Sequence, residues 1–322
     1  MTTPSIGKIL RPLVACLLTG YVLYRADPGA VLRAGANADW RWLLAAAVLV
    51  VADRSLMAYR WITLLCPVDA TSRPRVRELL HIFFVSTFLG TFLPASVGGD
   101  LVRAYSLARL EVARGQALAS VLMDRMLGVM SIVIVGVIGL LAAGRGDLIS
   151  IRGIYISLGV ASALSIGILA VVFSAQAADL ARRVAEALPI RRVGAIAGEV
   201  TGATRAYAPY HLQLINVLAG SVAVQLLRVA QAWCLGMALG IAAPFMVYLA
   251  FIPLILLVML LPVTINGIGT SQVAFVWFFS RAGTPAPAAF ALSVLFLGLG
   301  VLGNLPGGLL YALQPTPRPV KP

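Results

Sequence analysis

Apolar stretches long enough to cross a bilayer recur along most of the chain. We place membrane spans at six ranges: 10–25, 40–66, 117–142, 151–173, 212–241 and 287–312. A helix needs about 20 consecutive apolar residues to cross the hydrocarbon core. The pattern therefore predicts an all-α polytopic membrane protein, with residues 1–314 as a single integral membrane domain and a Pro-rich tail over 315–322 that we expect to be disordered.

Two further apolar segments, 79–93 and 246–262, each run into a Leu-Pro break, and each is followed by another helical piece. Leu93–Gly99 (LPASVGG) is echoed 168 residues later by Leu261–Gly267 (LPVTING), and Arg60 and Arg228 have that same offset. Within lipid a helix breaks only where protein or a water-lined cavity satisfies the freed backbone groups. Matched breaks in two halves point to a central transport site in a protein built from repeats.

Positive charge orients the predicted spans. Most Lys and Arg residues fall in the loops of one face, which places both termini in the cytoplasm and the protein in the cytoplasmic membrane. The loops before and after the first break are both strongly basic, so residues 79–101 enter and leave on the same side as a re-entrant hairpin. Residues 246–281 form either a hairpin from the opposite face or two full crossings, which gives about six to eight transmembrane helices. The matched arginine offset favours an inverted repeat with opposed hairpins.

Composition agrees with this class, since 60% of the residues are hydrophobic and 11% are charged. The formal net charge of +13 would suit nucleic acid, but the basic residues flank membrane spans and form no contiguous basic face outside them. We therefore expect anionic lipid, and not nucleic acid, as the partner.

Charged residues inside the predicted spans are the candidate substrate site: Asp53, Arg54, Arg60, Asp124, Arg125 and Arg228. Each arginine at mid-membrane costs about 2.5–3.5 kcal/mol on insertion scales. Asp53 and Arg60 lie about 10 Å apart along one helix face, so each should meet a residue of another helix. Two interpretations stay open. The neighbouring charges form buried pairs that only fix the fold, or the surplus arginine charge binds an anionic group such as a lipid phosphate.

The breaks add a second set of candidates, whose backbone N–H groups and polar side chains can face a cavity: Pro94, Gly98, Gly99, Asp100, Arg103, Pro262, Asn266, Gly267, Gly269 and Gln272. Asp100 and Arg103 lie one helical turn apart, and they either close the first hairpin as a local ion pair or gate entry at the cytoplasmic face.

Several motifs resemble those of the lysylphosphatidylglycerol synthase transmembrane region family, also called flippase-like domain proteins. They are AYRWITLL (58–65), FLPASVGGDLVRAYSLAR (92–109), SVLMDRMLG (120–128), LPVTINGIGTSQVAFVWFF (261–279) and LPGGLLYAL (305–313). The resemblance implies movement of lipids or lipid-linked groups between leaflets, with aminoacylated phosphatidylglycerol or polyprenyl-phosphate-linked sugars as the family's cargo. It covers only the membrane region, so we do not expect the synthase activity of the family's soluble transferase domain.

One departure from the family pattern concerns Ser271 and Gln272, which stand where the family often has an Arg-Glu pair. A role that needs a carboxylate there, such as proton coupling, is therefore not expected.

The function that these features favour is flippase-like translocation of an anionic phospholipid or a polyprenyl-phosphate-linked lipid, carried out either alone or with a biosynthetic enzyme acting on the same lipid as partner. Two alternatives stay open: a secondary transporter of a small anion, and a membrane-embedded lipid-modifying enzyme. An enzyme would need a nucleophile with a positioned base, yet the two histidines, His81 and His211, both look interfacial. We expect no catalytic residue, no metal and no cofactor.

Overall fold

A computed structural model describes residues 38–68, 73–93, 98–110, 112–142, 201–260 and 269–313, together with a few single residues elsewhere. The long helices are α3 (Trp40–Thr63), α6 (Arg114–Ala142), α10 (His211–Ala238) and α13 (Ala286–Leu302), which α14 (Leu305–Ala312) continues. The shorter ones are α4 (Val76–Gly90), α5 (Gly98–Ala108), α11 (Phe245–Met259) and α12 (Thr270–Arg281), and a 3-10 turn, η2 (Ala208–Tyr210), precedes α10.

Four helical stretches among the described residues are long and apolar enough to cross a membrane: Trp40–Thr63, Arg114–Ala142, Thr201–Ala238 and Ala286–Ala312. They confirm the predicted spans at 40–66, 117–142, 212–241 and 287–312, and the chain is an all-α polytopic membrane protein. The predicted spans at 10–25 and 151–173 and the tail at 315–322 lie outside the described residues.

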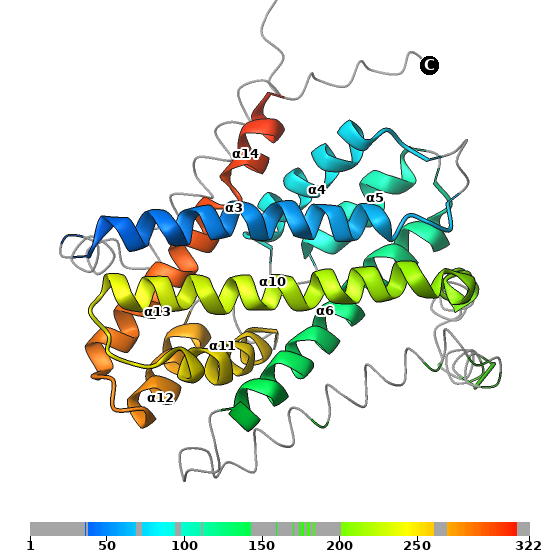
Figure 1. Cartoon of the computed structure of the whole chain (residues 1–322). Coiled ribbons are helices and arrows are strands. Elements are labelled where there is room, and N and C mark those ends of the chain that lie inside the picture. The colour runs from blue at the N-terminus through cyan, green and yellow to red at the C-terminus, as the bar shows by residue number, and fades with distance from the viewer. Residues whose placement is uncertain are drawn as a thin grey trace, which may run out of the picture.

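Helices α3 and α10 lie side by side across the middle of the molecule and run in opposite directions (Figure 1). At one end the amide of Asp39 donates to the Ala238 carbonyl at 3.0 Å, and at the other the Tyr207 hydroxyl donates to the Leu64 carbonyl at 2.6 Å. The start of each helix therefore meets the end of the other. Because α3 and α10 are equivalent at the 168-residue offset, their antiparallel packing is what an inverted repeat requires.

The remaining helices follow the same offset. Shifted by 168 residues, α4 falls on α11, α5 overlaps α12, and α6 falls on α13 and α14. The packing is reciprocal, since α4 packs against α14 while α11 packs against α6. Gly139 of α6 and Gly307 of α14 are 168 residues apart, and a Cβ on either would strike a backbone carbonyl, of Leu249 or of Phe84. Equivalent glycines thus allow the two halves to interlock through equivalent pairs of helices.

The short helices pair as α4 with α5 and α11 with α12. A Cβ on Gly90 would lie 2.9 Å from the Gly99 Cα, so α4 and α5 cross in backbone contact there. Helices of 15, 11, 15 and 12 residues are only about 16–23 Å long, which is shorter than a hydrocarbon core of about 30 Å. Their length favours two hairpins over two pairs of full crossings. The tips that would join their arms, 94–97 and 261–268, lie outside the described residues.

The predicted span at 287–312 differs from a single straight helix. It breaks at Gly303 and Asn304, where α13 ends and α14 begins with Pro306 in its first turn. Proline lacks the N–H that an uninterrupted helix would need and clashes with the preceding turn. This is a further helix break at a Leu-Pro step, Leu305-Pro306, and it positions part of the site described below.

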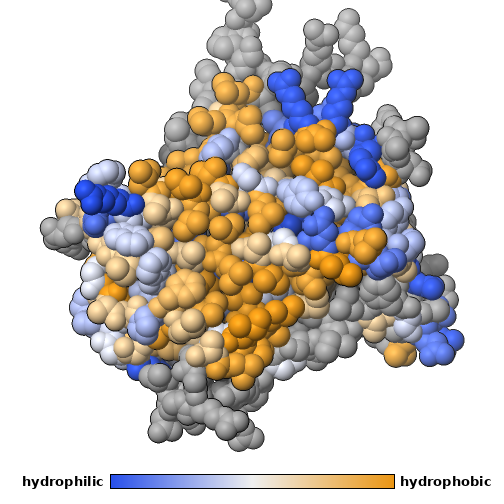
Figure 2. All heavy atoms as spheres, viewed as in Figure 1, coloured by the Kyte–Doolittle hydropathy of each residue, from blue (hydrophilic) through white to orange (hydrophobic). Residues whose placement is uncertain are grey.

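Apolar side chains cover much of the face seen in Figure 2, and the most hydrophilic ones lie chiefly toward its margins. Exposed apolar residues include Val48 and Val51 on α3 and Ile215 and Leu226 on α10. An apolar surface of this kind is the expected outer face of a helical bundle in lipid.

Adding a single methyl group at Gly307 tests the close contact between α14 and α4. Gly307→Ala should lower the stability by about 1–3 kcal/mol, because the added Cβ overlaps the Phe84 carbonyl of the packed α4 backbone. The melting temperature of the purified protein in detergent reports this change. Gly298→Ala on α13 is the matched control, since nothing lies within 4 Å of a Cβ there. An equal melting temperature for both variants would contradict the close contact.

Candidate functional site

Asp53, near the middle of α3, is shared by two arginines. Its Oδ2 accepts a hydrogen bond from Arg54 Nη1 at 2.8 Å, and its Oδ1 accepts one from Arg228 Nε, on α10, at 3.0 Å. Asp53 is 3% exposed, so its charge is neutralised within the protein rather than by solvent. Two guanidinium groups around one carboxylate leave a net positive charge at this point of the α3–α10 contact.

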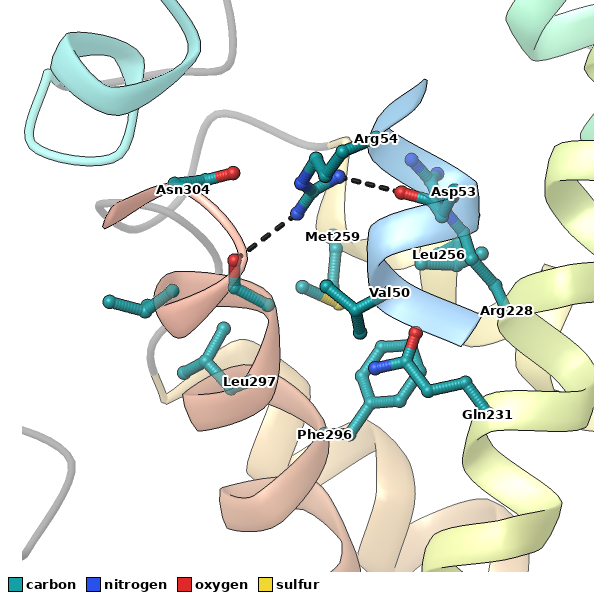
Figure 3. Close-up of a pocket in the computed structure, with 12 residues that line it drawn as sticks. Val50, Asp53, Arg54, Arg228, Gln231, Leu256, Met259, Phe296, Leu297 and Asn304 are labelled. Carbon is teal, nitrogen blue, oxygen red and sulfur yellow. Dashed lines mark hydrogen bonds and ion pairs between the residues drawn. The ribbon is translucent and has the colours of Figure 1, made fainter. Parts of the chain in front are cut away.

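Beside these three residues lies a cavity of about 220 Å³, which we call the arginine cavity. It is formed between α3, α10, α11 and the end of α13 (Figure 3). Its lining residues are Val50, Asp53, Arg54, Arg228, Gln231, Leu256, Met259, Phe296, Leu297, Gly300, Val301 and Asn304. The lining combines charged and amide side chains on one part with apolar walls on the other, and the volume exceeds that of several water molecules.

The break between α13 and α14 supplies one wall of the arginine cavity. The backbone amide of Asn304 donates to the Val301 carbonyl, as the helix tightens at its end, and the Gly300 carbonyl accepts instead from Arg54 Nη2 at 3.2 Å. A helix end leaves carbonyls without helical partners, and here a guanidinium satisfies one of them. Glycine at position 303 allows the end of α13 to approach α3, because a Cβ there would collide with Val50 on α3.

A second cluster surrounds Asp124 on α6, and we call it the Asp124 cluster. Asp124 Oδ1 accepts from Arg60 Nη2 at 2.8 Å, and Oδ2 lies 3.4 Å from Arg103 Nη1. Arg60 and Arg103 are 3% and 5% exposed. Arg103 also lies over the rings of Trp61 and Phe83, with its Cζ 5.2 and 4.8 Å from the two centroids. Gly220 makes room for the Arg60 side chain, since a Cβ there would lie 3.1 Å from Arg60 Cγ.

Asp100 and Arg103 do not pair with each other, which corrects the expectation of a local ion pair. Instead Asp100 pairs with Arg125 on α6, while Arg103 pairs with Asp124 on the same helix. Two successive charges on α6 therefore meet two charges one turn apart on α5. The result clamps the second arm of the first hairpin to α6.

The predicted substrate residues thus fall into two groups. Asp53, Arg54 and Arg228 line the arginine cavity, whereas Arg60, Asp124 and Arg125 belong to the Asp124 cluster and its clamp. As expected, Asp53 and Arg60 each find a partner on another helix.

The second-hairpin candidates that the structure describes have a local role. The Gln272 side chain accepts from the Gly269 amide at 2.6 Å and caps the start of α12. Gly269 has φ +90°, a conformation that favours glycine. Pro94, Pro262, Asn266 and Gly267 lie outside the described residues.

Sequence reasoning missed two polar residues of the arginine cavity, Gln231 and Asn304. Gln231 lies three residues after Arg228, so helical spacing alone could have found it. Asn304 directly precedes the break at Leu305-Pro306, which a search for repeated Leu-Pro steps could have found.

Fold and site together define a polytopic membrane protein built from two interlocked repeats, with a cationic cavity between their helices. The family model of the lysylphosphatidylglycerol synthase TM region matches residues 8–307, so the chain belongs to this family. The TM region is a domain separate from the family's catalytic transferase. No curated protein and no solved structure matches the chain.

The burial of the Asp124 cluster predicts how much stability the protein loses when Asp124 is replaced. Asp124→Asn should destabilise the protein by about 3–5 kcal/mol, because two buried guanidiniums lose their shared countercharge. Asp100→Asn should cost about 1 kcal/mol or less, since its partner Arg125 has a side chain 38% exposed. Melting temperatures in detergent compare the two. A similar loss in both variants would contradict the dependence on burial.

Proposed function

We propose that this protein carries out flippase-like translocation of an anionic lipid or lipid-linked headgroup across the cytoplasmic membrane, with both termini in the cytoplasm. The observation that carries the proposal is the arginine cavity, where Arg54 and Arg228 share the single carboxylate of Asp53. Membership of the TM-region family supports a lipid-related role in the membrane.

The charge balance supports an anionic ligand. Among the described residues, the ion pairs of the arginine cavity, the Asp124 cluster and its clamp to α5 contain five arginines and three carboxylates. The arginines are Arg54, Arg60, Arg103, Arg125 and Arg228, and the carboxylates are Asp53, Asp100 and Asp124. Holding an arginine within the bilayer costs about 2.5–3.5 kcal/mol. An anionic headgroup would offset part of that cost when it enters the cavity, and guanidinium groups suit phosphate oxygens well.

The walls of the arginine cavity support a lipid as the source of that headgroup. Apolar residues from α11 and α13 lie directly beside the arginines, including Leu256, Met259, Phe296 and Leu297. A headgroup can meet the polar lining while its acyl tails stay in the bilayer. A small soluble anion would use the same arginines, so the experiment must separate the two.

The second hairpin lines the arginine cavity and the first contacts one of its lining residues, Asn304, which suggests how the cavity opens. Leu256 and Met259 come from the first arm of the second hairpin, and Asn304 donates to Thr91, at the end of α4 in the first hairpin, at 2.8 Å. Movement of either hairpin would therefore change the cavity walls. A rigid bundle moving around a fixed central site is a common plan of repeat-built transporters.

A leaflet-resolved assay tests the proposal. The protein is reconstituted into vesicles with acyl-labelled fluorescent phosphatidylglycerol, and a membrane-impermeant quencher measures how much label reaches the outer leaflet. Arg54→Gln and Arg228→Gln should each slow translocation by roughly tenfold to a hundredfold, because each removes a charged hydrogen bond worth about 1.5–3 kcal/mol.

Arg41→Gln on α3 and Arg205→Gln just before α10 are the matched controls, because both arginines are exposed and lie away from the arginine cavity. They should translocate lipid at the wild-type rate. Uptake of labelled glycerol phosphate without movement of lipid would contradict the proposal and favour a transporter of small anions. Unchanged lipid movement in both cavity variants would contradict the role of the arginine cavity in translocation.

A further inference from the structure

The described lining of the arginine cavity has no free carboxylate for a positively charged headgroup. Among the described residues of its lining, Asp53 is the only acidic one, and both of its carboxylate oxygens already accept hydrogen bonds from arginine. The other walls come from α10, α11 and α13, and residues 200–322 contain no Asp or Glu at all. An ammonium group entering the cavity would meet two guanidinium charges and no free carboxylate to pair with.

The same arginines have capacity left for an anion. Arg228 Nη2 lies 3.1 Å from the Met57 thioether, and Arg54 Nη1 lies 3.5 Å from the same sulfur. A thioether is a weak acceptor, so a phosphate oxygen would be a much stronger partner for these N–H groups.

Two of the lining side chains also carry a polar atom that lacks a hydrogen-bond partner. Arg54 Nε and Asn304 Oδ1 are both buried without a hydrogen bond, and the Asn304 side-chain amide points toward Arg54 in Figure 3. The orientation of that amide follows from its neighbour: the Thr91 hydroxyl donates to the Thr87 carbonyl at 3.1 Å, so it can only accept from Asn304 Nδ2. One group that can accept from Arg54 and donate to Asn304 is a hydroxyl.

Resting on the proposed function, we propose that the arginine cavity selects a phosphate headgroup that carries a hydroxyl and no ammonium. The phosphate lies against Arg54 and Arg228, and a hydroxyl of its glycerol or sugar substituent bridges Arg54 Nε and Asn304 Oδ1. Headgroups that carry an amino group, including aminoacylated phosphatidylglycerol, are disfavoured by the positive charge of the cavity.

Three short-chain lipids test this selection by direct binding to the purified protein in detergent. Dihexanoyl phosphatidylglycerol is anionic and has hydroxyls, dihexanoyl phosphatidylmethanol has the same charge without hydroxyls, and the lysyl ester of the first adds ammonium groups. Phosphatidylglycerol should bind about tenfold more tightly than either of the others. Affinity for the lysyl ester equal to that for phosphatidylglycerol would overturn the charge selection, and equal affinity for phosphatidylmethanol would overturn the role of the hydroxyl.

Two variants assign the selection to residues. Gln231→Glu adds a carboxylate to the cavity lining and should reduce the preference for phosphatidylglycerol over its lysyl ester by about tenfold. Asn216→Asp, on an exposed part of the same helix, is the matched control and should leave the preference unchanged. Asn304→Ala should abolish the preference for phosphatidylglycerol over phosphatidylmethanol. Unchanged preferences in both cavity variants would overturn the proposal.

The binding assay tests the selection of the headgroup and the leaflet assay tests translocation, so either proposal can be contradicted without the other. Selective binding without lipid movement would contradict the proposed translocation and leave the selection intact. Lipid movement with no preference among the three headgroups would contradict the selection and leave the proposed translocation intact. Glycerol phosphate is a further binding probe: affinity equal to that of the short-chain lipid would overturn the lipid as the source of the headgroup.

Discussion

The fold depends on the need of buried guanidinium groups for a countercharge. Asp53 and Asp124 each serve two arginines, and through them α3 is tied to α10 and α6, while α6 is tied to α5. In an apolar interior an unpaired charge is far more costly than an unpaired neutral group. These contacts therefore fix which helices are neighbours and at what height, a specificity that apolar packing between lipid-exposed helices provides poorly.

The two halves share a backbone plan but differ in chemistry. The first hairpin is clamped to α6 by Asp100 and Arg103, whereas the equivalent sequence positions in the second half are the uncharged Ile268 and Ser271. Aromatic contacts hold the second hairpin instead, with the ring centroid of Phe275 on α12 lying 5.5 Å from that of Phe296 on α13. Directional charged hydrogen bonds therefore fix the first hairpin, whereas apolar contacts without fixed directions hold the second.

The arginine cavity arises where three helix interruptions converge. The break after α13 exposes the Gly300 carbonyl and places Asn304, Thr91 at the end of α4 accepts a hydrogen bond from Asn304, and α11 supplies Met259 just before the second Leu-Pro. Interrupted helices are tolerated in membranes where the freed backbone groups find polar partners. Here Arg54 is that partner, so one side chain both completes the backbone hydrogen bonding and presents charge to the cavity.

The sequence by itself determined the class of protein, the central spans, the two pairs of short helices and the repeat, because long apolar runs and Pro-Gly breaks have few other solutions in lipid. It also marked the charged residues that had to be buried. Only the tertiary structure decided their partners: Asp124 binds Arg60 and Arg103 instead of its neighbour Arg125, and Asn304 meets Thr91 across 213 residues. Helix periodicity fixes the face on which a side chain lies, but the rotation and crossing of packed helices decide which faces meet.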